Sequence, residues 1–205
     1  MARVFVMRHP ETVANVEGRY CGVTDSPWTD RGREQAKHLK RFTEEVAPAQ
    51  VWSSPAQRAL KAAHVASPCT TMLRIVEDLR EVDFGRAEGM TASEARQAGV
   101  AVRISPPHPL ANAAGANGGS EVIAPGGEGW GDFLERVDRV RDAAQDQRAT
   151  LCIFTHGGTG RALIARLLGL SLDAMWLFSL APGGFAELAY EDGIASLVRL
   201  CPPEV

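Results

Sequence analysis

The sequence has little cysteine and no paired cysteine motif. Only four of its 205 residues are cysteines, and no two of them form a C-x-x-C pair. An even count would permit two disulfides, but Cys152 lies in the apolar run 151–154, where a small buried thiol is expected. We therefore expect a reducing, cytoplasmic setting for this protein.

The sequence also lacks a basic run and a long uninterrupted hydrophobic run. Its 22 Lys and Arg residues against 25 Asp and Glu residues give a formal net charge of −3. Such a chain is a poor candidate for sequence-independent binding to nucleic acid or to a membrane surface. The most apolar stretch, residues 162–190, is broken by charged residues and by Pro-Gly-Gly, which argues against a membrane span. The apolar run at 2–7 is too short for the hydrophobic part of a signal sequence. We expect no nucleic-acid and no membrane partner, so any bound anion must be held by a local cluster.

Motifs for a metal ion or a nucleotide are missing as well. The histidines show no ligand-type spacing, and several arginines near them would repel a cation. No Walker sequence is present, and the glycines at 157, 158 and 160 lack the third spaced glycine of a dinucleotide fingerprint. The sequence predicts no metal and no other cofactor. A nucleotide-binding module remains an alternative interpretation, with less support from the motifs.

Strand and helix patterns alternate along the chain. Short apolar runs at 2–7, 50–53 and 150–155 read as buried strands. This alternation predicts an α/β fold with a largely parallel sheet. Helical patterns are expected at 29–46, 55–66, 129–147 and 159–168, a further strand at 71–76, and a C-terminal strand pair at 185–190 and 194–200 joined by Glu-Asp-Gly.

One domain over residues 1–205 is expected, because no internal repeat and no linker divides the chain. The least regular part is a Gly/Pro-rich excursion at about 100–131. Long connections in compact domains are uncommon without a role. The excursion is either a surface loop or a lid that selects the substrate, and the sequence leaves both open.

Basic side chains stand after three of the predicted strands. Arg8 and His9 follow the first, Arg58 lies early in the helix after the second, and His156 follows the third. Each residue taken singly has an ordinary explanation, such as a surface charge or a hydrogen-bonded structural histidine. Because the carboxyl ends of parallel strands share one edge, which the following helices approach with their N-termini, we expect these residues to meet. Together they predict a pocket for a doubly charged oxyanion, with phosphate as the leading candidate.

An ordered set of motifs resembles a known family. Residues 6–15, Val-Met-Arg-His-Pro-Glu-Thr-Val-Ala-Asn, are similar to the Arg-His-Gly-Glu-Thr-x-x-Asn signature of the histidine phosphatase superfamily, which includes cofactor-dependent phosphoglycerate mutases. This resemblance implies a three-layer α/β/α sandwich with a mostly parallel central sheet, as in phosphoglycerate mutase. Further matches follow in the family's order at residues 22–29, 32–36, 53–59, 79–89, 125–128 and 155–158.

The resemblance also implies roles for individual residues. His9 would attack phosphorus and form a phosphohistidine, with its other ring nitrogen donating to a backbone acceptor. Glu81 would be the general acid and then the general base, which calls for a pKa raised by desolvation or by the charge of the incoming phosphate. Charge on the transferring phosphoryl group would be stabilised by Arg8, Arg58 and His156, and the substrate would be bound by Asn15, Cys21, Gly22 and Gly157.

Two further comparisons set the expected reaction. Pro10 replaces the family's usual glycine, so the backbone at this position has no amide hydrogen to donate. Because of this departure, a catalytically inactive phosphate-binding module remains one alternative. The segment 83–89 resembles the phosphatase branch, and no counterpart of the mutase insert is found, so hydrolysis is favoured over mutase activity. Residues 18–25 are similar to a loop of α-ribazole phosphatases, which makes a small phosphorylated metabolite, and α-ribazole 5′-phosphate in particular, the candidate substrate. A homodimer is left open.

Overall fold

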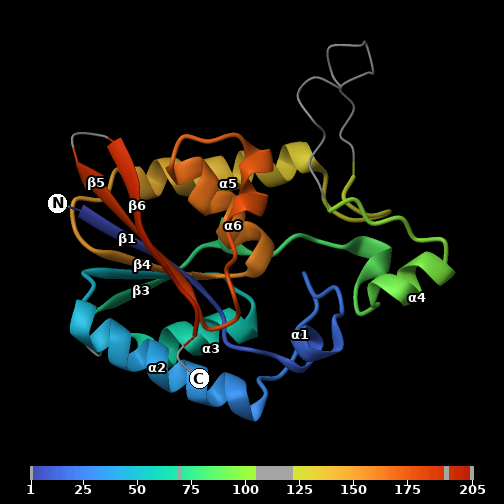
Figure 1. Ribbon diagram of the computed structural model, residues 1–205, viewed down its shortest axis with the longest axis horizontal. Helices are drawn as coiled ribbons and strands as arrows, with labels where there is room; N and C mark the ends of the chain where they lie inside the picture. Colours follow the sequence, from blue (N-terminus) through green and yellow to red (C-terminus); the bar gives the residue numbers. More distant parts are fainter. Residues whose placement is uncertain (1, 69–70, 105–121, 192–193, 204–205) are drawn as a thin grey trace.

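A six-stranded sheet forms the centre of the protein (Figure 1). The structure is a computed structural model that describes residues 2–68, 71–104, 122–191 and 194–203. The strand order across the sheet is β3-β2-β4-β1-β5-β6. In chain order the strands are β1 (Ala2–Arg8), β2 (Gln50–Ser53), β3 (Met72–Ile75), β4 (Leu151–Thr155), β5 (Phe185–Glu191) and β6 (Ile194–Cys201).

Four strands of the sheet run parallel. β4 lies between β1 and β2 and pairs with both in parallel, and β2 pairs with β3 in the same way. β5 pairs antiparallel with β1 and with β6, as expected for a C-terminal hairpin. The prediction of a largely parallel α/β sheet is therefore confirmed, and the carboxyl ends of β1, β2 and β4 lie at one edge.

Helices cover both faces of the sheet because the first strand alternates between two apolar sets. Val4 and Val6 pack into a core shared with α5 (Trp130–Gln145) and α6 (Gly157–Leu167). Phe5 and Met7 point to the opposite face and pack with residues of α2 (Asp30–Val46) and α3 (Gln57–Ala66). Successive strand side chains point to opposite faces, so one short strand supports both layers. The expected three-layer sandwich is confirmed (Figure 1).

Two helices begin at different residues from those predicted. α3 starts at Gln57 and not at Pro55, because Ala56 is still extended and serves as the N-cap. α6 starts at Gly157, directly after the N-cap His156, and not at Thr159. In contrast, α2 begins as predicted after Thr29, whose side chain accepts a hydrogen bond from the Gly32 amide.

Short elements beside the carboxyl edge were not predicted. α1 (Val13–Glu17) and α4 (Ala92–Gln97) each begin with a capping box, formed by Thr12 with Asn15 and by Thr91 with Glu94. Elements of five or six residues show too little periodicity to detect in a sequence. The same holds for three 3-10 helices, η1 (Glu77–Leu79), η2 (Gly85–Ala87) and η4 (Leu172–Leu177).

Part of the Gly/Pro-rich excursion lies outside the described residues. Its two ends, 100–104 and 122–131, are described, but 105–121 are not. Whether this segment is a lid or a surface loop therefore stays a prediction, and the turn at 192–193 and Cys69 also lie outside the described residues. Within the described ranges, no helix combines the length and apolar character needed to span a membrane.

Candidate active site

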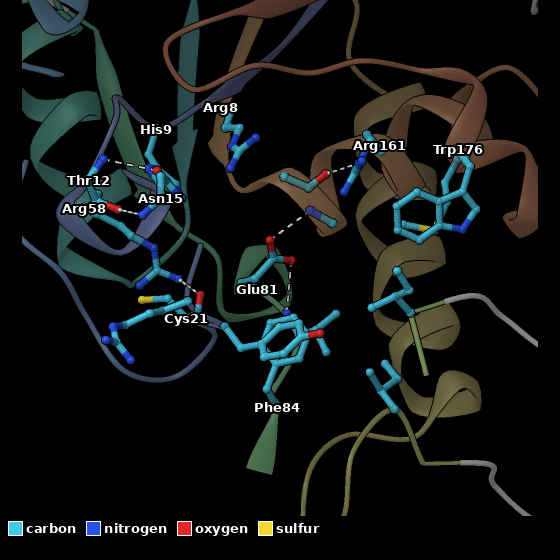
Figure 2. A pocket seen from close by; sticks show the side chains of 18 of the residues that line it. Arg8, His9, Thr12, Asn15, Cys21, Arg58, Glu81, Phe84, Arg161 and Trp176 are labelled. Atoms are coloured by element: carbon cyan, nitrogen blue, oxygen red, sulfur yellow. Dashed lines mark hydrogen bonds between the residues drawn. The ribbon is translucent and has the colours of Figure 1, made fainter. Parts of the chain in front are cut away.

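A cavity of about 280 Å³ opens where the carboxyl ends of the parallel strands meet. Arg8, His9 and Asn15 lie along one part of its wall, with Arg58 beside them (Figure 2). Glu81 stands between this polar group and an opposite wall that carries Arg161 and Trp176. The sheet edge thus brings together most of the residues that the sequence indicated, next to a larger apolar surface.

His9 is held by the backbone on both sides. It follows β1, its amide donates to the Thr155 carbonyl of β4 at 2.9 Å, and its carbonyl accepts from the Gly183 amide at 3.0 Å. Its Nδ1 lies 2.7 Å from the Pro10 carbonyl oxygen. A carbonyl oxygen can only accept a hydrogen bond, so Nδ1 must carry the ring hydrogen. The Nε2 atom is then the unprotonated nitrogen. The expected backbone acceptor exists, and because it is a carbonyl, proline at position 10 supplies it as well as glycine would.

The surroundings of His9 favour its neutral form. The side chain is buried, and burial together with the nearby His156, Arg8 and Arg58 holds the pKa of His9 well below its usual range, despite the opposing hydrogen bond to Pro10. A neutral imidazole with a fixed tautomer is the nucleophilic form. The environment therefore supports the role that the sequence predicted for His9.

Arg8 lies beside His9 with its guanidinium against Gly157. One terminal nitrogen donates to the Leu180 carbonyl at 2.9 Å, while Nε is buried and has no partner among the described residues. Burial lowers the pKa of Arg8 to about 10, with Glu81 opposing and Arg161 adding to the effect, so the group is cationic at neutral pH. A Cβ at position 157 would stand 3.0 Å from Arg8 Cζ, which explains the glycine there.

Arg58 borders the cavity but has its hydrogen bonds within the protein, so its expected grip on the phosphoryl oxygens stays a prediction. The side chain is 2% exposed and borders the cavity. Its terminal nitrogens donate to the carbonyl oxygens of Cys21, Gly22 and Thr24, at 3.0, 2.9 and 2.7 Å. In this structure Arg58 therefore holds the loop 21–24 and brings its charge to the edge of the cavity.

The loop 21–24 is held from its other side by Glu88. This carboxylate accepts hydrogen bonds from the amides of Gly22, Val23 and Thr24 and from the Thr24 hydroxyl. Both backbone groups of Gly22 are thus engaged within the protein, and Gly22 does not line the cavity. Cys21 does line it, and its thiol donates to the Thr24 carbonyl at 3.2 Å.

Glu81 sits at the N-terminus of α6, where backbone amides favour its ionised form. Its carboxylate accepts from the amides of Gly158 at 2.8 Å, Thr159 at 2.9 Å and Val82 at 3.1 Å. Burial alone would raise the pKa of Glu81, but these amides and the charge of Arg58 outweigh it, and the pKa lies below its ordinary value. In the protein alone, desolvation is thus offset by three backbone donors and does not raise this pKa. The other expected cause, the charge of an incoming phosphate, stays a prediction.

His156 packs against His9 and is not among the residues that line the cavity. It is fully buried, and its ring centroid is 5.2 Å from that of His9 in an edge-on arrangement. Its Nε2 lies 2.7 Å from the Ser54 hydroxyl. Burial and the charges of Arg58 and Arg8 lower the pKa of His156 well below its usual range, so the ring is neutral.

Asn15 and Gly157 both line the cavity, as the sequence predicted for substrate-binding residues. The Asn15 side-chain oxygen accepts from the Thr12 amide at 3.1 Å within the α1 capping box. Because that oxygen is engaged, the amide nitrogen with its two hydrogens is the end that remains for a ligand.

Comparison with known proteins decides the family. The model of the histidine phosphatase superfamily (branch 1) matches residues 4–201. The chain belongs to the histidine phosphatase superfamily. It is 31% identical over 198 residues to an adenosylcobalamin/α-ribazole phosphatase of Escherichia coli (strain K12), covering 95% of this chain and 93% of the relative.

The relatives of this superfamily member do not all carry the same substrate name. The crystal structure of the α-ribazole phosphatase from Shigella flexneri matches with a TM-score of 0.80 and 30% identity, covering 98% of this chain and 96% of that one. Phosphoserine phosphatase 1 of Hydrogenobacter thermophilus is 26% identical over 208 residues, covering 98% of this chain and 92% of the relative. The chain is a phosphatase of the superfamily, and these names leave its substrate open.

Arg161 and Trp176 are among the residues of this phosphatase's cavity that escaped the sequence analysis. Arg161 lies one helical turn after Gly157, to whose carbonyl its Nε donates at 2.9 Å. Its guanidinium lies 4.5 Å from the Trp176 ring centroid, in cation–π contact. The one-turn spacing from the Gly157 motif was a usable signal for Arg161. Trp176 gave none, because it reaches the cavity from η4, a short element that the sequence does not reveal.

The remaining wall of the cavity is apolar. Tyr20 and Phe84 lie together there, with ring centroids 5.0 Å apart. Tyr20 falls within the loop that the sequence singled out for substrate choice, and Phe84 within the segment that carries Glu81. As for metals, among the described residues no three His, Cys, Asp or Glu side chains are grouped so as to hold an ion.

Proposed function

We propose that this phosphatase hydrolyses small phosphomonoesters through a phosphohistidine formed on His9. The observation that carries the proposal is the 2.7 Å contact between His9 Nδ1 and the Pro10 carbonyl, because it leaves Nε2 unprotonated. Arg8, Arg161 and Arg58 surround the cavity with positive charge. Phosphoryl transfer depends mainly on positioning and charge stabilisation, which these residues provide without a metal.

In the first step, His9 Nε2 attacks phosphorus and the bond from phosphorus to the ester oxygen breaks. Arg8 and the Asn15 side-chain amide stabilise the negative charge on the phosphoryl oxygens. The leaving oxygen takes a proton from Glu81 and departs as an alcohol. The phosphoryl group is then carried on Nε2, while Nδ1–H remains bound to the Pro10 carbonyl.

The proton that Glu81 donates must arrive with the substrate. Glu81 is ionised in the protein alone, since its pKa is lowered. A phosphomonoester has a second pKa of about 6 and so exists partly as a monoanion. In the occupied site, the monoanion transfers its proton to Glu81, because a dianionic phosphate beside the carboxylate raises the pKa of that group. We propose that the reacting pair is protonated Glu81 with a dianionic phosphate.

In the second step, Glu81 acts as the base. It takes a proton from water, whose oxygen attacks phosphorus as the bond to His9 Nε2 breaks. Inorganic phosphate takes this proton from Glu81 and leaves as the monoanion, so Glu81 returns to its ionised form and His9 to its neutral form. The reaction therefore consumes one water and needs no cofactor.

We propose α-ribazole 5′-phosphate as the substrate. Relatives about 30% identical carry the name α-ribazole phosphatase. The cavity wall beyond Glu81 offers Tyr20, Phe84 and Trp176, a surface that suits a planar aromatic base. An aromatic group at this wall would leave the phosphate near His9, with the ribose between.

Hydrolysis of an aryl phosphate tests the chemical proposal. We expect turnover in the presence of chelator, inhibition by vanadate, and a loss of about 10⁴-fold or more in kcat for His9→Asn. Loss of activity with chelator would refute the metal-free mechanism, and an active His9→Asn variant would refute the nucleophile. Phosphate binding without turnover would identify an inactive module.

A comparison of natural phosphomonoesters tests the substrate. We expect kcat/KM for α-ribazole 5′-phosphate to exceed the values for phosphoserine and for 3-phosphoglycerate. A preference for phosphoserine would replace the substrate and leave the mechanism intact. Transfer of phosphate between phosphoglycerates, in place of release into water, would instead indicate mutase activity.

A further inference from the structure

The hydrogen bonds of His156 are incomplete at one of its two ring nitrogens. Its Nε2 is paired with the Ser54 hydroxyl at 2.7 Å, whereas its Nδ1 is buried without a partner among the described residues. The ring lies against the His9 ring, 5.2 Å between centroids. A buried polar atom without a partner is rare and calls for an explanation.

Ser54 is fixed by the same strand ends that place the two histidines. It follows β2, which pairs with β4, and its amide donates to the Phe154 carbonyl at 2.9 Å. Its side chain is fully buried, and its oxygen accepts from the Ala56 amide at 3.3 Å. The hydroxyl therefore faces His156 from a backbone that is held on both sides.

The position of one proton follows from the donors and acceptors around Ser54. If His156 Nε2 carried the hydrogen and donated to Ser54, the hydroxyl hydrogen would have no acceptor among the described residues. If Ser54 donates to Nε2, its hydrogen is satisfied and its oxygen still accepts from Ala56. The second arrangement leaves the single ring hydrogen of a neutral His156 on Nδ1.

The charges around His156 exclude a doubly protonated ring near neutral pH. The groups that act on it are Arg58 from α3, Arg8 from β1 and Arg136 from α5, all positive, and together with burial they lower its pKa. His9, which faces it, is neutral for the same reasons. The ring thus has one N–H, and the hydroxyl of Ser54 selects which nitrogen bears it.

We infer that Ser54 is a positioning residue that holds His156 in its Nδ1–H tautomer, so that Nδ1 donates a hydrogen bond to the phosphoryl group during transfer. The inference rests on the proposed function, since the missing acceptor is an oxygen of the substrate. In the other tautomer a lone pair would face a negatively charged oxygen, and the stabilisation would become repulsion.

Long-range ¹H–¹⁵N correlation spectra of the histidine rings test the tautomer directly. The His156 signals are assigned by their absence in His156→Gln. We expect the Nδ1–H pattern in the wild-type protein and the Nε2–H pattern, or a mixture, in Ser54→Ala. A wild-type ring in the Nε2–H form, or an unchanged pattern in Ser54→Ala, would overturn the inference.

Kinetics of matched serine variants supply the second readout. Ser53 is equally buried, and its hydroxyl donates to the Ser54 carbonyl at 2.9 Å, so Ser53→Ala removes a comparable bond away from His156. We expect kcat for the aryl phosphate to fall by about tenfold to a hundredfold in Ser54→Ala, with little change in Ser53→Ala. Ser54→Cys, which keeps a weak donor, should lie between wild type and Ser54→Ala.

These outcomes separate the inference from the proposed function. Equal losses in Ser53→Ala and Ser54→Ala would assign Ser54 a structural role only and overturn the inference. Thermal unfolding of both variants shows whether their stabilities match. If the wild-type protein does not hydrolyse phosphomonoesters, the proposed function fails, but the tautomer of His156 is still measured by the spectra.

Discussion

At the scale of single residues, the protonation states of His9 and Glu81 set the pH range of the reaction. Burial and neighbouring positive groups lower the pKa of His9 well below its usual 6.5. Its reactive form is the neutral one, and a lowered pKa extends that form to lower pH. Glu81 needs a proton that the substrate monoanion supplies, so kcat/KM falls as pH rises past the substrate's pKa of about 6.

We therefore predict that kcat/KM is highest on the acid side of neutrality. The decline at low pH should begin below 6.5, because His9 becomes protonated only there. A profile of kcat/KM for a phosphomonoester from about pH 4 to about pH 9 measures both limbs. An acid limb centred at or above 6.5, or an optimum in the alkaline range, would contradict these protonation states.

Trp176 should affect the choice of substrate more than the chemical step. It lies on the wall opposite His9 (Figure 2), so it is placed to contact the organic part of the substrate. For Trp176→Ala we expect KM for α-ribazole 5′-phosphate to rise about threefold to tenfold, which corresponds to the binding free energy of one aromatic contact. Phosphoserine, which has no ring, should be little affected. Leu177→Ala is the control, because Leu177 is 78% exposed and does not line the cavity.

The family resemblance indicated which residues form the site, but the sequence did not reveal all of their contacts. His9 and Arg8 could be placed because Arg8 ends β1 and His9 directly follows it, so that the end of the strand fixes their position. The contacts of Arg58 could not be foreseen, because they depend on the path of the loop 21–24. The lowered pKa of Glu81 depends on amides of α6 that lie 77 and 78 positions away in the chain.

At the scale of elements, Glu88 anchors the loop that carries the acceptors of Arg58. We predict that Glu88→Gln raises KM for the aryl phosphate by about tenfold or more, because an amide cannot accept from all the donors that the carboxylate now binds. Steady-state kinetics measure the change. The control is Glu34→Gln, since Glu34 is exposed on α2 and pairs with Lys37. An unchanged KM in Glu88→Gln would show that the loop holds its position without this anchor.

The start of an element was harder to predict than its existence. In the part of the chain that the structure describes, the four long helices and the six strands were anticipated, since strand runs and amphipathic helices show their period in the sequence. α3 starts later than predicted because Ala56 is still extended and serves as its N-cap, which leaves Pro55 outside the helix. α6 starts early because its cap is His156, which is not a usual capping residue.

At the scale of the whole molecule, a buried ion pair joins the helical layer to the segment that carries Glu81. Arg136 of α5 is 1% exposed and donates to both oxygens of Glu128, at 2.6 and 2.8 Å. It also donates to the carbonyls of Asp78 and Arg80, both at 2.8 Å. The Arg136 side chain thus links α5 to the end of the Gly/Pro-rich excursion and to the segment that carries Glu81.

We predict that Arg136→Met lowers the free energy of unfolding by about 3–5 kcal/mol, because it leaves Glu128 charged and buried without its main partner. Urea unfolding measures the loss. Adding Glu128→Leu should restore part of the stability, since the unpaired charge is then removed as well. A double variant less stable than Arg136→Met would contradict this explanation.

The central claim is that the phosphoryl group passes through His9 Nε2, and trapping the intermediate tests it most directly. Rapid quenching of the reaction under alkaline conditions, followed by mass analysis of the intact chain and its peptides, detects and locates the phosphoryl group. We predict one phosphoryl group per chain, on His9, attached through Nε2 and absent in His9→Asn. Turnover with no phosphoryl-enzyme, or with the group on another residue or on Nδ1, would contradict the account.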